Sequence, residues 1–167
     1  MKVIGISGWS GNGKTTLLER LLPILINRGY SVSTLKHAHH NFDIDKPGKD
    51  SFRHREAGAT EVLISSAQRW ALMHENRDED EAGLQSLISK MTPVDILLIE
   101  GFKKEKFPKI EVWREKNDTE PLFITDNSVV AIATNATDLK TKLPLLNIND
   151  EKEIADFIIS NLLNKAA

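Results

Sequence analysis

The chain has 167 residues, which is the length of one domain and enough to bury roughly two-thirds of the surface that an unfolded chain exposes. Its 22 Lys and Arg residues against 24 Asp and Glu residues give a net charge of −2, and neither half of the chain is basic. This balance argues against a nucleic-acid-binding protein, which normally shows a basic domain or stripe. Because there is no cysteine, disulfide frameworks, thiolate nucleophiles and cysteine-ligated zinc are excluded.

The apolar segments of the chain are too short for a membrane span or a secretory signal. The most apolar stretch, residues 17–26, is interrupted by Glu19, Arg20 and Pro23, whereas a membrane-spanning helix requires about 20 apolar residues. The apolar start over residues 3–6 runs at once into glycines, unlike the longer core of a signal peptide. We therefore expect a cytoplasmic protein with no membrane partner.

The first part of the chain predicts a strand, a helix and a second strand. Residues 2–7 form a short, mostly apolar run before a glycine-rich loop, which is typical of a buried parallel strand. Over residues 14–27 the leucines recur at helical spacing, with Pro23 predicted to bend the helix and Gly29 to end it. A strand over residues 31–35 would complete a right-handed βαβ unit.

The middle of the chain is predicted to contain a polar loop and two short strands. Residues 36–55 carry four of the five histidines and a Lys-Pro-Gly-Lys turn, which is typical of a functional or mobile loop. A short helix is expected near residues 51–57, and strands over 61–65 and 69–73 are joined by a tight turn. The acidic segment over residues 78–91 is predicted to form a helix.

The last part of the chain supplies the remaining strands and a closing helix. Residues 94–99 are an uninterrupted apolar run that ends in a Glu-Gly pair, as a central parallel strand ends at a ligand-binding edge. Two more strands are expected over residues 110–114 and 129–134, and residues 150–163 show the spacing of an amphipathic helix. This alternation predicts an α/β three-layer fold with a mostly parallel central sheet, in one domain over residues 1–167.

The segment from Gly8 to Thr15 matches the phosphate-binding pattern G-x-x-x-x-G-K-[ST] and stands between a predicted strand and a predicted helix. Its glycines let backbone N–H groups turn inward around phosphate oxygens, and the helix directs its positive dipole end at the same charge. Lys14 is predicted to reach the β and γ phosphates and Thr15 to bind Mg²⁺. The sequence thus predicts a P-loop NTPase fold. The expected nucleotide-binding residues are Gly8, Trp9, Ser10, Gly11, Asn12, Gly13, Lys14, Thr15 and Thr16, although Trp9 is equally suited to packing at the rim.

A carboxylate from a neighbouring strand usually accompanies Mg²⁺ in such a site, and Asp95 and Glu100 stand at the two ends of one predicted strand. At about 3.3 Å per residue they are roughly 16 Å apart, and only the C-terminal end of a parallel strand shares an edge with the phosphate loop. Glu100 is therefore expected to hold Mg²⁺ or to orient an attacking water, unless it merely fixes a loop, and Asp95 is expected to be structural. Asp50 is either a helix N-cap or a second carboxylate at the metal. The candidate catalytic residues are Lys14, Glu100 and Asp50, and the candidate Mg²⁺ ligands are Thr15, Glu100 and Asp50.

The polar loop over residues 36–55 mixes histidines and aspartates with lysines and arginines. A metal site is disfavoured because the histidines lack the helical i, i+4 spacing, whereas the positive charges suit an anionic ligand. A solvated loop without a ligand is the alternative. The candidate anion-binding or partner surface consists of Lys36, His37, His39, His40, Lys49, Arg53 and Arg55.

Asn135 and Asp138 follow a predicted strand in an N-x-x-D spacing that suits guanine. An aspartate accepts hydrogen bonds from the two donors on guanine N1 and N2, which adenine does not offer, and an asparagine can bond the O6 and N7 side. GTPases commonly carry N-K-x-D here, and in this chain Ala136 replaces the lysine whose stem would cover the base. A plain turn without a ligand is the alternative.

Taken together, four segments resemble the molybdopterin-guanine dinucleotide biosynthesis protein B (MobB) family over nearly the whole chain. The first is shared by many P-loop proteins, and the second and third are distinctive. The four segments are residues 4–16 (IGISGWSGNGKTT), 35–45 (LKHAHHNFDID), 48–58 (GKDSFRHREAG) and 99–103 (IEGFK). The resemblance implies a homodimeric GTP-binding accessory protein with slow GTP hydrolysis, which assists a guanylyltransferase in attaching GMP to molybdopterin.

The resemblance also implies that residues 8–16 bind the nucleotide phosphates and that Glu100 and Asp50 lie near the metal. The polar loop could then receive a phosphorylated pterin, a second nucleotide or the partner enzyme. A small-molecule P-loop kinase using ATP or GTP is the alternative, with the polar loop as its acceptor site. A scaffold with a vestigial loop is a third possibility. The nearest cationic cluster for a kinase is expected to be a solvated loop and consists of Lys103, Lys104, Lys106 and Lys109.

Overall fold

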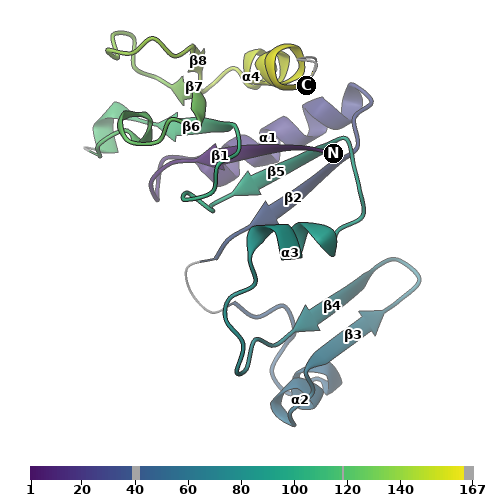
Figure 1. Cartoon of the computed structure of the whole chain (residues 1–167). Coiled ribbons are helices and arrows are strands. Elements are labelled where there is room, and N and C mark those ends of the chain that lie inside the picture. The colour runs from purple at the N-terminus through teal and green to yellow at the C-terminus, as the bar shows by residue number, and fades with distance from the viewer. Residues whose placement is uncertain (39–41, 118, 164–167) are drawn as a thin grey trace. The chain divides into compact units, whose positions relative to one another are not determined.

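The computed structural model describes residues 1–38, 42–117 and 119–163, and the chain divides into two compact units (Figure 1). Met1–His37 and Pro93–Ala167 form the first, here called the sheet unit, and Ala38–Thr92 form the second, the hairpin unit. A single domain over residues 1–167 stays a prediction, because compact units of one chain need not fold independently.

The sheet unit is built on a six-stranded sheet in the order β2-β5-β1-β6-β7-β8, whose paired strands all run parallel. The strands are β1 (Lys2–Ser7), β2 (Val32–Lys36), β5 (Ile96–Glu100), β6 (Lys109–Trp113), β7 (Val129–Thr134) and β8 (Leu145–Asn147). Because β5 lies between β1 and β2, the two strands of the predicted βαβ unit are parallel but not adjacent. The α/β fold with a mostly parallel central sheet is confirmed.

Helix α1 (Lys14–Asn27) follows β1 and packs on one face of this sheet, as its leucine spacing predicts. Leu17, Leu21 and Leu25 are buried against it. The helix ends at Asn27, and Gly29 follows with a φ of +89° and donates its N–H to the carbonyl of Ile26. No helix in the described part of the chain combines the length and the apolar character that crossing a membrane requires.

Helix α4 (Glu151–Phe157), continued by the π-helix η3 (Ile158–Leu163), packs beside α1 in the same core. Asp150 caps it by accepting hydrogen bonds from two backbone N–H groups of its first turn. The predicted helix over residues 150–163 is therefore confirmed, with a change of helical type at Ile158.

Alternate residues of β6 face the other side of the sheet, where a small apolar cluster covers Trp113. The 3-10 turn η2 (Leu122–Ile124) packs on it, and a further turn, η1 (Glu115–Asn117), follows β6. On this face Lys109 is buried, with Nζ 2.7 Å from the Asp126 carboxylate. The expectation that Lys109 belongs to a solvated loop is therefore wrong, because its charge is paired inside the fold.

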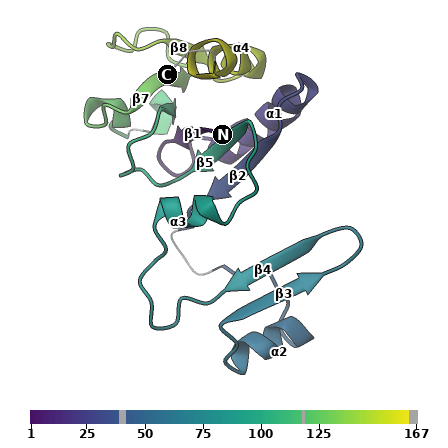
Figure 2. The same ribbon diagram turned by 45° about the vertical axis from the view of Figure 1, so that its right-hand side comes forward.

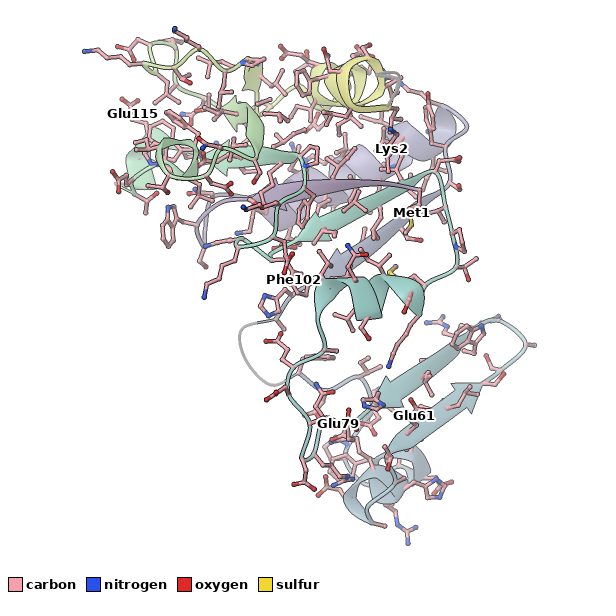
Figure 3. All side chains as sticks on the ribbon, in the orientation of Figure 1. Met1, Lys2, Glu61, Glu79, Phe102 and Glu115 are labelled. Carbon is pink, nitrogen blue, oxygen red and sulfur yellow. The ribbon has the colours of Figure 1, made fainter. Side chains whose placement is uncertain are left out.

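The hairpin unit contains the antiparallel strands β3 (Glu61–Ser65) and β4 (Trp70–His74), with α2 (Asp50–Glu56) packed beside β3 (Figure 2). His74 lies between the carboxylates of Glu61 and Glu79, which Figure 3 labels near one end of the hairpin. Both predicted strands are confirmed to within one residue.

The predicted helix over residues 78–91 is much shorter in the structure, where α3 spans only Leu84–Ser89. Gly83 has an extended backbone and occupies the N-cap position. Glycine is a poor helix former, so the helix begins after Gly83, and the four acidic residues before it lie outside α3.

Candidate nucleotide-binding site

The phosphate loop turns tightly between the end of β1 at Ser7 and the start of α1 at Lys14. Gly8 has a φ of +145° and lies so close to β6 that a Cβ atom would stand 2.3 Å from the carbonyl oxygen of Val112. Gly13 has a φ of +96° and is the N-cap of α1. A residue with a side chain would strain both positions, so the sequence pattern corresponds to a backbone requirement.

Asn12 anchors this loop to the neighbouring strand. Its side chain is fully buried and its Nδ2 donates to the carbonyl of Val112 at 2.9 Å. Its backbone N–H donates to the carbonyl of Trp9 across the loop. The contribution of this residue to nucleotide binding would therefore come through the backbone conformation it fixes.

The ammonium group of Lys14 folds back over the loop and donates to the carbonyl of Trp9 at 3.0 Å. Burial lowers the pKa of Lys14, the Glu100 carboxylate opposes that shift, and the positive charges of Lys103 and Lys36 add to it. Three ammonium groups and one carboxylate thus face the loop, an arrangement that favours a polyanionic ligand.

Thr15 and Glu100 meet at the same edge of the sheet, since β1 and β5 are neighbours with Ile6 and Glu100 in register. The Thr15 hydroxyl oxygen lies 3.4 Å from each oxygen of the Glu100 carboxylate. Lys36, the register partner of Glu100 on β2, places its Nζ 3.8 Å from Oε2. A hydroxyl and a carboxylate are the oxygen ligands that Mg²⁺ prefers, with phosphates and waters completing the shell.

Within the described residues no group of three or more histidine, aspartate or glutamate side chains is arranged to hold a metal by itself. A Mg²⁺ ion bound through Thr15 and Glu100 would therefore depend on the nucleotide for further ligands. The cavity between these groups has a volume of about 440 Å³ and is lined by Ser10, Gly11, Gly13, Lys14, Thr15, Thr16, Lys36 and Glu100.

Trp9 forms one rim of the loop and is 40% exposed. Its indole N–H donates to the carbonyl of Glu120 at 2.8 Å, and the ammonium group of Lys103 lies 4.2 Å from the ring centroid. The cation–π contact and the hydrogen bond hold the ring in place. Whether the indole also contacts a nucleotide stays a prediction.

Asp95 lies at the opposite end of β5 from Glu100, as the strand geometry predicts. Its carboxylate accepts hydrogen bonds from the hydroxyl and the backbone N–H of Ser31 at 2.6 and 2.8 Å, which lower the pKa of Asp95. These bonds connect the start of β2 to the start of β5, so the structural role expected for Asp95 is confirmed.

The N-x-x-D segment follows β7, and the register of β6 with β7 pairs Trp113 with Thr134 immediately before it. Asn135 and Asp138 are both exposed. The Thr134 hydroxyl accepts the N–H of Ala136 at 3.0 Å and tightens the turn. Recognition of guanine by Asn135 and Asp138 stays a prediction.

Two polar-loop residues belong to the sheet unit: Lys36 ends β2 beside Glu100 of β5, and His37 follows it. The imidazole of His37 stacks on the ring of Phe102, with centroids 4.5 Å apart. Figure 3 shows Phe102 at the end of the sheet opposite to Lys2. His39 and His40, also predicted for this surface, lie outside the described residues.

The other polar-loop residues belong to the hairpin unit. Lys49 and Arg53 are exposed, whereas the guanidinium of Arg55 lies 3.1 Å from carboxylate oxygens of both Asp43 and Asp45. These partners, Asp45 foremost, raise the pKa of Arg55 and neutralise its charge within the unit.

Asp50 is the first residue of α2, and Lys49 occupies the N-cap. The N-cap alternative for Asp50 is therefore wrong. Its carboxylate stands in the first turn, where a negative charge is favoured by the helix dipole. A metal-binding role for Asp50 stays a prediction.

Arg114 is a residue at this site that the sequence did not indicate. It follows β6, and its Nε donates to the carbonyl of Asn12 at 3.2 Å. The signal that could have found it is an arginine directly after a buried strand, but only the strand order shows that β6 neighbours the phosphate loop.

The parallel sheet and the tight glycine loop between β1 and α1 define an α/β protein with a P-loop NTPase fold. The model of the family described as "Molybdopterin guanine dinucleotide synthesis protein B" (MobB) matches residues 3–135, and the chain belongs to this family.

Similar proteins span almost the whole chain. This chain is 44% identical to the molybdopterin-guanine dinucleotide biosynthesis adapter protein of Escherichia coli K12, over 94% of this chain and 91% of that protein. The adapter protein of the same name from Haemophilus influenzae is 46% identical, over 93% and 86%. The crystal structure of Bacillus subtilis MobB superposes with a TM-score of 0.77 at 28% identity, covering 99% of this chain and 100% of that one.

Proposed function

We propose that this protein is a GTP-binding adapter of molybdopterin-guanine dinucleotide biosynthesis, acting in the cytoplasm beside the guanylyltransferase that attaches GMP to molybdopterin. The observation that carries the proposal is the meeting of Lys14, Thr15 and Glu100 around one cavity at the phosphate loop. Its membership of the MobB family and the adapter names of its relatives support the same role.

In this proposal the triphosphate lies in the loop against the backbone N–H groups at the start of α1. Lys14 exchanges the carbonyl of Trp9 for phosphate oxygens, and Thr15 and Glu100 bind Mg²⁺. The ion would neutralise charge on the phosphates. GTP hydrolysis is proposed to be slow, in keeping with the adapter role that the names of the relatives indicate.

The base is proposed to be guanine, read by Asp138 with support from Asn135. Calorimetric titration with Mg-GTP and Mg-ATP tests this on the unmodified protein and on Asp138→Ala. The control is Asp156→Ala, which removes another exposed aspartate from the sheet unit. A GTP preference that disappears only in Asp138→Ala supports the proposal. A preference for ATP in the unmodified protein would overturn guanine recognition.

The same loop could in principle serve a small-molecule kinase, but none of the relatives described above is named a kinase. Product analysis with Mg-GTP and Mg-ATP separates the two functions. An adapter yields only free phosphate, slowly, whereas a kinase transfers the phosphoryl group to an acceptor.

We also propose a homodimer formed through the hairpin unit. Leu63, Trp70 and Leu72 stand on one face of the β3–β4 hairpin, where they are 61%, 66% and 44% exposed. A two-stranded sheet is marginally stable alone, and a contiguous apolar face of this kind is typical of a protein interface. Sedimentation of the purified protein tests this state.

The polar loop is proposed as the surface for the guanylyltransferase or for the phosphorylated pterin. Lys49 and Arg53 carry this proposal because both are exposed. The double variant Lys49→Ala with Arg53→Ala should weaken capture of the guanylyltransferase or of molybdopterin. Unchanged binding of both would overturn this assignment.

A further inference from the structure

Arg114 lies between the two parts of the proposed nucleotide site. It directly follows β6, the strand between β1, which leads into the phosphate loop, and β7, which leads into the N-x-x-D segment. Because Trp113 and Thr134 are register partners, Arg114 and Asn135 stand at the same level where the two strands end. One residue is therefore beside both candidate binding segments.

The side chain of Arg114 points to the phosphate loop and is fixed there. Its Nε donates to the carbonyl of Asn12 at 3.2 Å. Its Nε and one terminal nitrogen also lie 3.8 Å from the position that a Cβ atom on Gly13 would occupy. The guanidinium plane thus stands against the backbone just before Lys14.

The opposite segment lacks the lysine whose stem usually covers the base. Ala136 occupies the place of the lysine in N-K-x-D, and its methyl group cannot extend over a purine. We propose that Arg114 supplies this contact from the neighbouring strand, with its guanidinium on the bound nucleotide between the α-phosphate and the purine. This inference rests on the proposed GTP binding and adds a residue that determines its affinity.

The chemistry of arginine suits this position. A guanidinium stacks on aromatic faces and donates several N–H groups in a rigid plane, so it can contact a purine, a ribose or a phosphate oxygen from one orientation. With Nε bonded to Asn12, the terminal nitrogens remain directed past Gly13. A side chain already fixed in this way loses little conformational entropy when a ligand binds.

A purely structural role for Arg114 makes a different prediction. If the side chain only braced the loop, its removal would weaken every ligand of the phosphate loop equally. If it contacts the nucleoside side, its removal weakens GTP more than an inorganic triphosphate, which has no ribose or base. The comparison of these two ligands therefore separates contact from bracing.

The experiment is calorimetric titration of the full chain with Mg-GTP and with Mg-tripolyphosphate, for the unmodified protein, Arg114→Ala, Arg114→Lys and Arg28→Ala. Arg28, paired with Asp156 beyond the other end of α1, is the matched control for loss of one arginine. Circular dichroism and urea unfolding verify that each variant is folded.

We expect Arg114→Ala to weaken Mg-GTP binding by about tenfold and tripolyphosphate binding by less than about threefold. Arg114→Lys, which keeps the charge but loses the plane, recovers only part of the GTP affinity, and Arg28→Ala binds both ligands normally. Equal losses for both ligands, or an unchanged GTP affinity in Arg114→Ala, would overturn the inference alone. If the unmodified protein binds tripolyphosphate but not GTP, the proposed function fails as well.

Discussion

The ammonium group of Lys109 lies 2.7 Å from the carboxylate of Asp126, with the lysine side chain 1% exposed and the aspartate side chain 25% exposed. A second acceptor, the carbonyl of Lys103, lies 2.7 Å from the same nitrogen. A charge buried in the strand next to β1 is thus neutralised by a loop residue 17 positions further along the chain. The pair fixes the segment between η2 and β7 to the sheet, on the face away from α1.

The unequal burial of this pair predicts unequal effects of removing either partner. Asp126→Ala leaves the deeply buried ammonium of Lys109 unpaired and should lower the free energy of unfolding by about 3 kcal/mol. Lys109→Met leaves only a partly exposed carboxylate and should cost less. Urea unfolding followed by tryptophan fluorescence measures both, with the solvent-facing Lys104→Met as control. A larger loss for Lys109→Met would contradict the prediction.

Glu111 predicts a pH dependence of stability. Burial raises the pKa of Glu111, against the hydrogen bonds that it accepts from the N–H groups of Leu122 and Phe123. A carboxyl group with a raised pKa in the folded state contributes stability that is present below its unfolded value of about 4.3 and is lost as pH rises through the folded value. The free energy of unfolding of the unmodified protein minus that of Glu111→Gln should therefore fall between pH 4 and pH 7. A difference that grows with pH would contradict the assignment.

Lys14→Ala tests the phosphate loop itself. Loss of one charge-assisted contact should weaken Mg-GTP binding by about 1.5 to 3 kcal/mol. Because burial already lowers the pKa of this ammonium group, we expect little loss of folding stability when it is removed. The control is the exposed Lys104→Ala, and calorimetry provides the affinities. Normal GTP affinity in Lys14→Ala would count against the whole site.

The sequence predicts the fold where local pattern and tertiary structure agree. The boundaries of α1, β1 and β7 match the residues predicted, because apolar spacing and glycine punctuation act locally. The short strand β8 is not predicted, because three residues are too few to show an alternating apolar pattern. The helix expected over residues 78–91 is too long, since the acidic segment shows no break before Gly83, whose extended backbone starts the helix later.

Part of the candidate site, like part of the fold, could be predicted from the sequence alone. The phosphate loop and the position of Glu100 follow from motif and strand direction, so both could be placed before the structure was known. The burial of Lys109 and the contact of Arg114 with Asn12 could not, because each depends on which strands are neighbours. Strand order is set by the packing of the whole sheet and has no local signature.

The exposed face of the hairpin makes a prediction about self-association. Leu63→Lys introduces a charge opposite Leu72, its register partner on β4, and should shift a dimer toward monomer by weakening the interface about tenfold or more. Ile124→Lys, at a similarly exposed position of the sheet unit, is the control. Sedimentation velocity over a range of concentrations measures both variants. A dimer unaffected by Leu63→Lys would place the interface elsewhere.

Two glycines of the phosphate loop form a matched pair for separating steric from conformational effects. Gly8 and Gly11 both have positive φ, +145° and +80°. A methyl group on Gly8 would stand 2.3 Å from the backbone of Val112, which belongs to a central strand and cannot yield, whereas nothing lies within 4 Å of one on Gly11. Gly11→Ala should therefore lower the free energy of unfolding only by the strain of a left-handed backbone, about 1 kcal/mol. Gly8→Ala should lower it by at least about twice as much.

The same pair should differ in ligand binding. In Gly8→Ala the loop must move away from β6, which also disturbs the anchoring of Asn12 on Val112, so Mg-GTP binding should be lost along with stability. In Gly11→Ala the anchor stays in place and binding should weaken only moderately. Thermal unfolding and titration with Mg-GTP measure the two effects. Equal effects of both substitutions would show that the contact of Gly8 with Val112 does not constrain the loop.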